Sequence, residues 1–124
     1  MNSLINKSIC IVSELMLCCH KLGGTTSHID VNLQSNTAYY KIRSPIAYVE
    51  LEDLERVRYY LNQPRDRMME ENYWMLGGQS EDDGQLMLIG MMVDDAEVTF
   101  ENGELCICVN RVGSAGGVSE TQRI

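Results

Sequence analysis

The stretch HIDVNLQSNTAYYKIRSP, residues 28–45, contains the clearest structural signal in the chain. Apolar and polar residues alternate on both sides of the turn sequence at 34–36. Because successive side chains of a strand point to opposite faces, this alternation predicts an antiparallel hairpin with one apolar and one polar face. Such a hairpin is typical of a sheet that is covered on one side only. The apolar positions are Ile29, Val31, Leu33, Ala38, Tyr40 and Ile42.

Residues 3–22, ahead of the hairpin, are predicted to form a helix. Their apolar residues recur at helical spacing and form two neighbouring stripes along the helix. We expect the side chains of this broad apolar face to be buried. One stripe holds Leu4, Ile11, Leu15, Cys18 and Leu22, and the other holds Ile5, Ile9, Val12, Met16 and Cys19. Gly23 and Gly24 follow, and glycine commonly ends a helix in a left-handed conformation.

After the hairpin, Pro45 ends the second strand and residues 49–64 form a second predicted helix. Its inward positions are expected to be Leu51, Leu54, Val57 and Leu61. Residues 65–76 are compatible with a short helix or an extended segment, and the glycine-bearing polar stretch 77–84 is predicted to be a loop.

The last part of the domain is predicted to be a buried helix over residues 85–95 and a second hairpin. The strands of this hairpin cover 96–100 and 104–110, joined by Glu101-Asn102-Gly103, a strong turn signal. The positions expected to face inward are Ala96, Val98, Phe100, Leu105, Ile107 and Val109. The predicted fold is therefore a two-layer α/β (α+β) sandwich, with a mostly antiparallel four-stranded sheet and helices on one face. It forms one domain over residues 1–112, followed by a flexible tail at 113–124.

Composition restricts the possible partners. With 10 basic and 18 acidic residues, the net charge of −8 is unfavourable for binding nucleic acid or an anionic membrane surface. No apolar run reaches the ~18 residues that span a bilayer, and the N-terminus lacks the pattern of a signal peptide. The five cysteines include an adjacent pair and a pair two residues apart, which is a poor disulfide framework. These features predict a cytoplasmic protein with reduced thiols.

The segment SELMLCCH, residues 13–20, contains residue types that bind metals or act as nucleophiles. On a helix, however, the side chains of Cys18 and Cys19 diverge by about 100°, and His20 lies on the polar side. The chain has no C-x-x-C or H-x-x-x-H spacing, so no metal site is expected. We interpret both cysteines as small core side chains rather than as metal ligands or a catalytic thiol.

The order of elements and several residues resemble the GHKL (histidine-kinase-like) ATPase domains, and within them the small anti-sigma-factor kinases. Glu14 and Gly23 keep the spacing of the glutamate and glycine in the first helix of that family. Residues 31–44 resemble its hairpin, and residues 86–111 resemble its last helix and closing hairpin. The resemblance covers roughly residues 5–112 and omits the usual N-terminal strand and helix of the family.

The chain departs from this family at the positions that bind ATP. The asparagine that holds magnesium is replaced by Cys18, and a thiol is a poor ligand for this hard cation. The Asp-x-Gly-x-Gly box that reads adenine is matched by Ser44-Pro45-Ile46-Ala47-Tyr48. The Gly-x-Gly of the phosphate loop is matched by Asp83 and Gln85, with Gly84 out of register. Of the family's functional residues, Glu14, its water-activating base, remains.

The resemblance therefore implies a non-catalytic regulatory or protein-interaction module that has lost nucleotide binding and needs no cofactor. Its partner is an unidentified protein. One alternative is an anti-sigma-factor-type kinase or ATPase with divergent motifs, in which Glu14 is catalytic. Another is a small-molecule sensor whose ligand occupies the former cleft, lined by Glu14, Cys18, Tyr48 and Trp74. We also predict a homodimer, because the missing N-terminal elements leave apolar surface less covered. Its outer sheet face bears Tyr39 and the pair Cys106 and Cys108.

Overall fold

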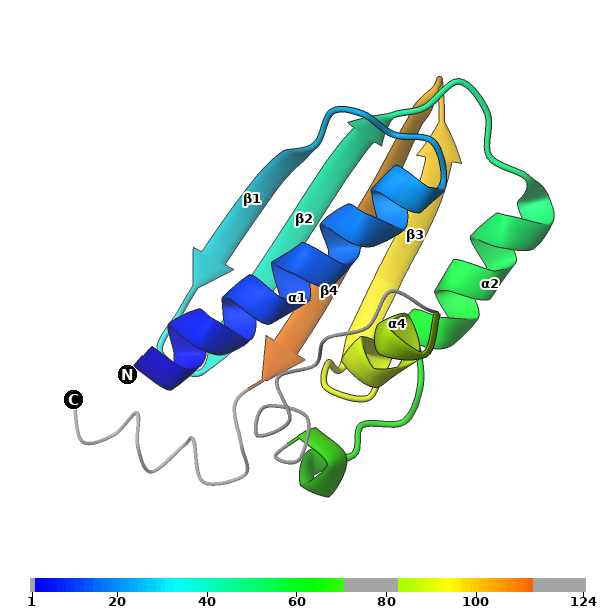
Figure 1. Cartoon of the computed structure of the whole chain (residues 1–124). Helices are drawn as coiled ribbons and strands as arrows, with labels where there is room; N and C mark the ends of the chain where they lie inside the picture. Colours follow the sequence, from blue (N-terminus) through cyan, green and yellow to red (C-terminus); the bar gives the residue numbers. More distant parts are fainter. Residues whose placement is uncertain (1, 71–82, 113–124) are drawn as a thin grey trace.

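The computed structural model describes residues 2–70 and 83–112. Within these residues, a long helix precedes a hairpin, two shorter helices follow, and a second hairpin closes the domain (Figure 1). The elements are α1 (Asn2–Lys21), β1 (His28–Leu33), β2 (Thr37–Pro45), α2 (Leu51–Leu61), α4 (Asp83–Gly90), β3 (Asp95–Glu101) and β4 (Glu104–Val112). A further helical turn occupies 67–70.

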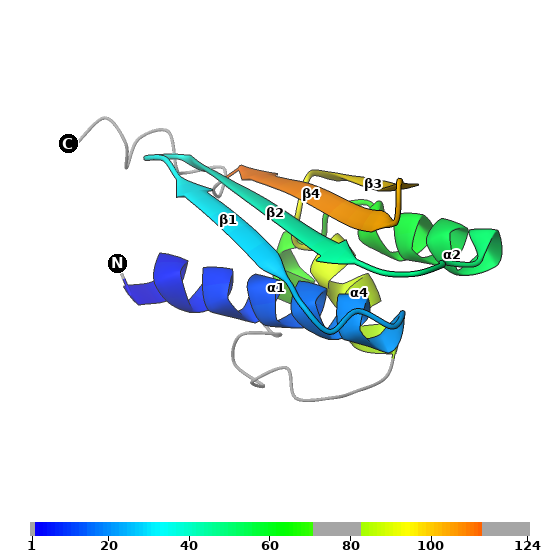
Figure 2. The same ribbon diagram turned by 90° about the horizontal axis from the view of Figure 1, so that it is seen from above.

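The four strands form one antiparallel sheet in the order β1-β2-β4-β3. Both hairpins are therefore adjacent pairs, and the two central strands, β2 and β4, join them. Figure 2 shows that α1, α2 and α4 all lie on one side of this sheet. The predicted α+β class, with an antiparallel four-stranded sheet and helices on one face, is confirmed.

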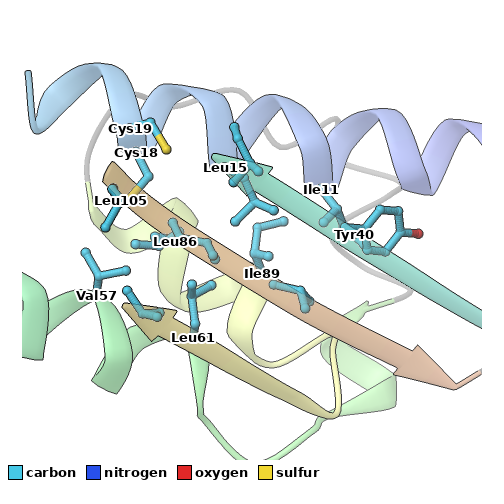
Figure 3. Packing of buried hydrophobic residues seen from close by; sticks show 14 of the residues in the cluster. Ile11, Leu15, Cys18, Cys19, Tyr40, Val57, Leu61, Leu86, Ile89 and Leu105 are labelled. Carbon is cyan, nitrogen blue, oxygen red and sulfur yellow. The ribbon is translucent and has the colours of Figure 1, made fainter. Parts of the chain in front are cut away.

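The core lies between the inner face of the sheet and the three helices (Figure 3). The two central strands contribute their alternate residues, as their polarity pattern predicted. These buried residues are Ala38, Tyr40, Ile42, Leu105, Ile107 and Val109. The hydroxyl groups of Tyr40 and Ser8 lie 2.8 Å apart and form a hydrogen bond that links the sheet to α1. Because both groups are buried, this bond satisfies polar atoms that water cannot reach.

Glycines end two of these elements. Gly23 has a φ of 108° directly after α1, which confirms the predicted left-handed helix end. Asn102 and Gly103 have φ values of 53° and 74° between β3 and β4. Positive φ at both central positions is the signature of the tight turn that matches strand twist, so the Asn-Gly signal predicted this hairpin correctly.

Several predicted details are wrong. The second helix ends at Leu61 rather than near residue 64, and Leu51 is 67% exposed because it lies in the first turn, beyond the sheet. The helix expected over 85–95 spans Asp83–Gly90, after which 91–94 form a turn into β3. The apolar side chains of β1 were expected to be covered, but Ile29 and Val31 are exposed.

The sequence reasoning also missed a buried ion cluster. Glu70, in the helical turn, is 4% exposed and accepts a hydrogen bond from the guanidinium of Arg111 on β4. Arg65 donates to the other oxygen of Glu70 at 3.1 Å and to Asp94 at 3.0 Å. The ammonium of Lys7 lies 3.7 Å from the same carboxylate. These contacts tie the chain after α2 to α1 and to the end of β4.

Candidate functional site

The segment that raised the possibility of chemistry, residues 13–20, lies in the C-terminal half of α1. Cys18 and Cys19 are 8% and 0% exposed, respectively, and belong to the core. His20 is exposed, and its Nδ1 lies 3.3 Å from the carbonyl oxygen of Gly24. Within 2–70 and 83–112, no three His, Cys, Asp or Glu side chains come together in a way that could hold a metal ion.

Burial also raises the pKa of the Cys19 thiol to about 12, with a smaller contribution from Cys106. A catalytic cysteine needs the opposite change, because the thiolate is the nucleophile. The raised pKa therefore argues against Cys19 as a catalytic nucleophile.

A pocket of about 230 Å³ opens beside α1, between this helix and the pair α2 and α4. Its walls are half apolar and half charged. The apolar residues are Leu17, Cys18, Leu22, Val57, Tyr60 and Leu86, and the charged residues are Glu14, Lys21, Asp53 and Arg56. The four charges balance formally, so the pocket suits a small neutral or zwitterionic ligand better than a polyanion.

Glu14 is the residue in this pocket with a perturbed acidity. Partial burial raises the pKa of its carboxyl, and the nearby ammonium of Lys21 opposes this effect. A carboxyl that protonates more readily than usual can act as a hydrogen-bond donor at mildly acid pH. Perturbed groups in concave sites are candidate functional residues, although structural groups also show such shifts.

The opposite wall carries an ion pair within α2. The guanidinium of Arg56 lies 2.8 Å from a carboxylate oxygen of Asp53, one helical turn away. The sequence signal for this wall was present but unused: Asp53, Arg56, Val57 and Tyr60 recur at spacings of three and four, which places them on one face of the helix.

The structure brings together some of the predicted cleft residues and separates others. Glu14 and Cys18 line the pocket. Ser44 does not: it is fully buried within β2, where its hydroxyl donates to the carbonyl oxygen of Thr26 at 2.7 Å. Tyr48 is 68% exposed outside the pocket wall. Gly84 lies in the first turn of α4, and Trp74 falls outside the described residues.

A second group of reactive residue types lies on the outer face of the sheet. The sulfur atoms of Cys106 and Cys108 are 3.8 Å apart, and both side chains are half-buried. Burial, then the neighbouring Cys108, raises the pKa of Cys106. A hydrogen bond to Cys108 is the main cause that raises the pKa of Tyr39 to about 12. The raised pKa values of Cys106 and Tyr39 mean that these two groups hold their protons more tightly than usual, which argues against either as an activated nucleophile.

Comparison of the chain with models of protein families, with curated proteins and with solved structures finds no match. Among the described residues, no helix combines the length and apolar character needed to traverse a bilayer.

Proposed function

We propose that this chain is a non-catalytic regulatory module, built on a GHKL-like fold, that has lost nucleotide binding and acts through contacts with another protein. The observation that carries the proposal is the composition of the pocket beside α1. The pocket contains Glu14, which matches the glutamate of the GHKL family, and Cys18, which stands where that family has its magnesium-binding asparagine. A thiol at that position is a poor ligand for a hard divalent cation, which prefers oxygen.

The order of the elements supports the same proposal. A long first helix, a hairpin, further helices, a final helix and a closing hairpin follow in the sequence that the resemblance implies. The pocket lies between the first helix and the later ones, on the covered side of the sheet. Its volume of about 230 Å³ is below the ~300–1,000 Å³ that is usual for sites of drug-sized ligands.

Ser44 adds a further argument. It stands where the family carries the aspartate that reads adenine, and its hydroxyl is buried and bonded to the backbone of Thr26. The side chain is therefore part of the structural connection between β2 and the segment after α1. It is not directed to a ligand, and the pocket walls do not include it.

The test is titration calorimetry of the full chain with magnesium-ATP and with magnesium-ADP. We expect no heat of binding with either nucleotide, and the same result for Cys18→Asn, which restores the metal ligand but not the adenine and phosphate contacts. A micromolar dissociation constant would overturn the proposal. So would ATP hydrolysis that Glu14→Gln abolishes while Glu52→Gln, an exposed carboxylate on α2, leaves it unchanged.

A small-molecule sensor is the second candidate, because the pocket combines apolar walls with two charges of each sign. Native mass spectrometry of the freshly purified chain would detect a retained ligand. A bound species that is lost in a pocket variant such as Val57→Trp, but kept in an α2 surface variant such as Tyr59→Trp, would favour the sensor. An empty pocket in the native spectrum would favour the interaction module.

A further inference from the structure

Helix α1 has two flanks, one on each side of its buried stripe. One flank carries Glu14, Leu17 and Lys21, which line the pocket against α2 and α4. With 100° per residue, Ile5, Ile9 and Met16 lie roughly 80–120° around the helix on the other side of Leu15. That flank therefore faces away from α2 and α4, toward the side of the sheet that ends with β1.

These three side chains are exposed, although they are large and apolar. Ile5, Ile9 and Met16 are 47%, 56% and 45% exposed, respectively. They represent the second of the two apolar stripes predicted for this helix. In the described structure, nothing from this chain covers them, whereas Leu15 on the first stripe is 1% exposed.

The strand next to this flank shows the same mismatch. Val31 of β1 stands opposite Tyr40 of β2, and Ile29 stands opposite Ile42, so all four side chains lie on the inner face. Tyr40 and Ile42 are buried, but Ile29 and Val31 are 36% and 45% exposed. Helix α1 lies over β2 and β4, with β1 to one side (Figure 1), and the inner-face side chains of Ile29 and Val31 remain exposed.

The exposed apolar side chains of α1 and β1 on this side of the molecule define a surface that we call the open edge: Ile5, Ile9, Met16, Ile29 and Val31. It borders the free backbone edge of β1, the first strand in the sheet order. The strand at the other edge of the sheet, β3, forms hydrogen bonds with side chains of α2 and of the residue after it. Arg58 donates to the carbonyl oxygen of Val98 at 2.9 Å, and the side-chain oxygen of Asn62 accepts from the backbone N–H of Ala96 at 3.1 Å.

We propose that the open edge binds a second copy of this chain. Strand β1 pairs antiparallel with β1 of the other copy about a two-fold axis through Val31, which extends the sheet across the interface. The two α1 helices then face each other over the new strand pair. One symmetric contact satisfies the backbone edge and buries the apolar side chains of both elements.

Symmetry and charge favour this register over the one centred on Asp30. A two-fold axis normal to the sheet leaves the inner faces of both copies on the same side. Opposing residues of the two strands then share a face only when the axis lies midway between two copies of the same residue. An axis through Asp30 would place two carboxylates opposite each other, which is unfavourable. An axis through Val31 places Asp30 opposite Asn32, whose amide can donate to the carboxylate, and Ile29 opposite Leu33. The strand is thus complementary to itself in the second register, which is why a second copy suits it.

The C-terminal segment is a poorer occupant of the same surface. Residues 113–124 contain two large aliphatic side chains, Val118 and Ile124, among glycines and polar residues. This composition cannot cover five exposed apolar side chains. The proposed dimer does not depend on whether the pocket beside α1 binds a nucleotide, because the open edge lies on the other flank of α1.

The experiment is light scattering and sedimentation of the full chain across the micromolar range. We expect a dimer that strengthens with salt, because each copy carries a net charge of −8 and screening reduces their repulsion. Val31→Lys should shift the protein to monomer, because it places two ammonium groups side by side at the axis. Tyr59→Lys, an equally drastic change at an exposed residue of α2, should leave the dimer intact.

Cross-linking tests the register. At a residue on the axis, opposing Cα atoms lie about 4.5–5.5 Å apart, within disulfide range. Val31→Cys should therefore form a disulfide-linked dimer under mild oxidation faster than Asp30→Cys, after the background of the unmodified chain is subtracted. A strict monomer at high micromolar concentration would overturn the proposal, as would a dimer that Val31→Lys does not weaken. Faster cross-linking of Asp30→Cys would overturn the Val31 register.

Discussion

Gly90, the last residue of α4, lies directly against the backbone of α2. A Cβ atom there would lie 1.9 Å from the carbonyl oxygen of Tyr60 and 2.9 Å from the Cα of Leu61. Both neighbours are backbone atoms, which cannot move without shifting α2. The absence of a side chain is therefore a requirement of the packing, and it explains why the apolar sequence tolerates a glycine inside a helix.

Gly90→Ala is expected to destabilise the domain by roughly 4 kcal/mol or more, which is in the range reserved for severe core disruption. Gly103→Ala is the matched control. Its nearest neighbour would be 3.8 Å away, so it should lose only the ~1–2 kcal/mol cost of a left-handed alanine. Urea unfolding of both variants measures the difference. Equal losses would mean that α2 and α4 are less closely packed than the structure indicates.

The carboxyl of Glu14 is expected to make the free energy of unfolding depend on pH. Burial raises the pKa of its carboxyl in the folded state, so the folded chain binds this proton more tightly than the unfolded chain does. Stability from this group is greatest at low pH and is lost as the pH rises through the raised pKa. Glu14→Gln, which mimics the protonated form, is expected to raise the melting temperature at neutral pH. The gain should shrink toward zero as the pH falls below the normal range of a glutamate.

Thermal unfolding of the wild type and Glu14→Gln across this pH range measures the effect. Glu52→Gln, at an exposed position of α2, serves as the control and should show little change at any pH. A Glu14 variant that is less stable at neutral pH would show that its carboxylate is stabilised by Lys21 more than it is penalised by burial.

Residues 65–70, after α2, are tied to the sheet by a buried ion cluster. Glu70 is buried between Arg65 and Arg111, whose side chains are 9% and 5% exposed. Removing one member of such a group leaves buried charges without compensation, which typically costs about 3–5 kcal/mol. Glu70→Gln is expected to lose stability in this range. Glu55→Gln, which breaks an exposed pair with Arg58, should cost no more than about 1 kcal/mol.

Chemical denaturation of these two variants is the measurement. If Glu70→Gln were as mild as Glu55→Gln, the cluster would be hydrated in solution and would not fix the segment. Sequence reasoning could not find this cluster, because Lys7 and Arg111 are far in the chain from Arg65 and Glu70. No local pattern distinguishes a buried charge from the many exposed ones.

Where local pattern determines an element, sequence reasoning was reliable. Period-two alternation and the Asn102-Gly103 turn located both hairpins, and the glycine after α1 located its end. The prediction was wrong where the neighbour of an apolar residue decides the outcome. The pattern of β1 matches that of β2, yet β1 is the edge strand, and its Ile29 and Val31 remain exposed. Polarity alone does not reveal which of two equivalent strands lies at the edge.

The candidate site was predicted in the same partial way. Glu14 and Cys18 were placed in the cleft through the family resemblance, and both line the pocket. Asp53 and Arg56 complete the pocket through tertiary contacts, which a single sequence does not encode locally. Ser44 and Tyr48 were assigned by alignment to a family motif, and neither lines the pocket.

The five thiols differ in burial, so their rates of alkylation can report on the stability of the whole domain. None forms a disulfide, and they differ in burial: Cys18 and Cys19 are in the core, whereas Cys10, Cys106 and Cys108 are half-buried. Burial raises the pKa of Cys19 to about 12 and raises that of Cys10 less strongly. Alkylation requires both access and a thiolate. Cys18 and Cys19 are therefore expected to react only when the whole domain opens.

Iodoacetamide labelling at mildly alkaline pH, followed by peptide mass spectrometry, tests this order. Cys10, Cys106 and Cys108 should label first in the native protein. Cys18 and Cys19 should label together, at a rate that rises with urea in parallel with global unfolding. Gly90→Ala should accelerate the labelling of Cys18 and Cys19 through its effect on the opening equilibrium, and change the other three much less. Labelling of Cys19 as fast as Cys10 in the native protein would show that α1 separates from the sheet without global unfolding.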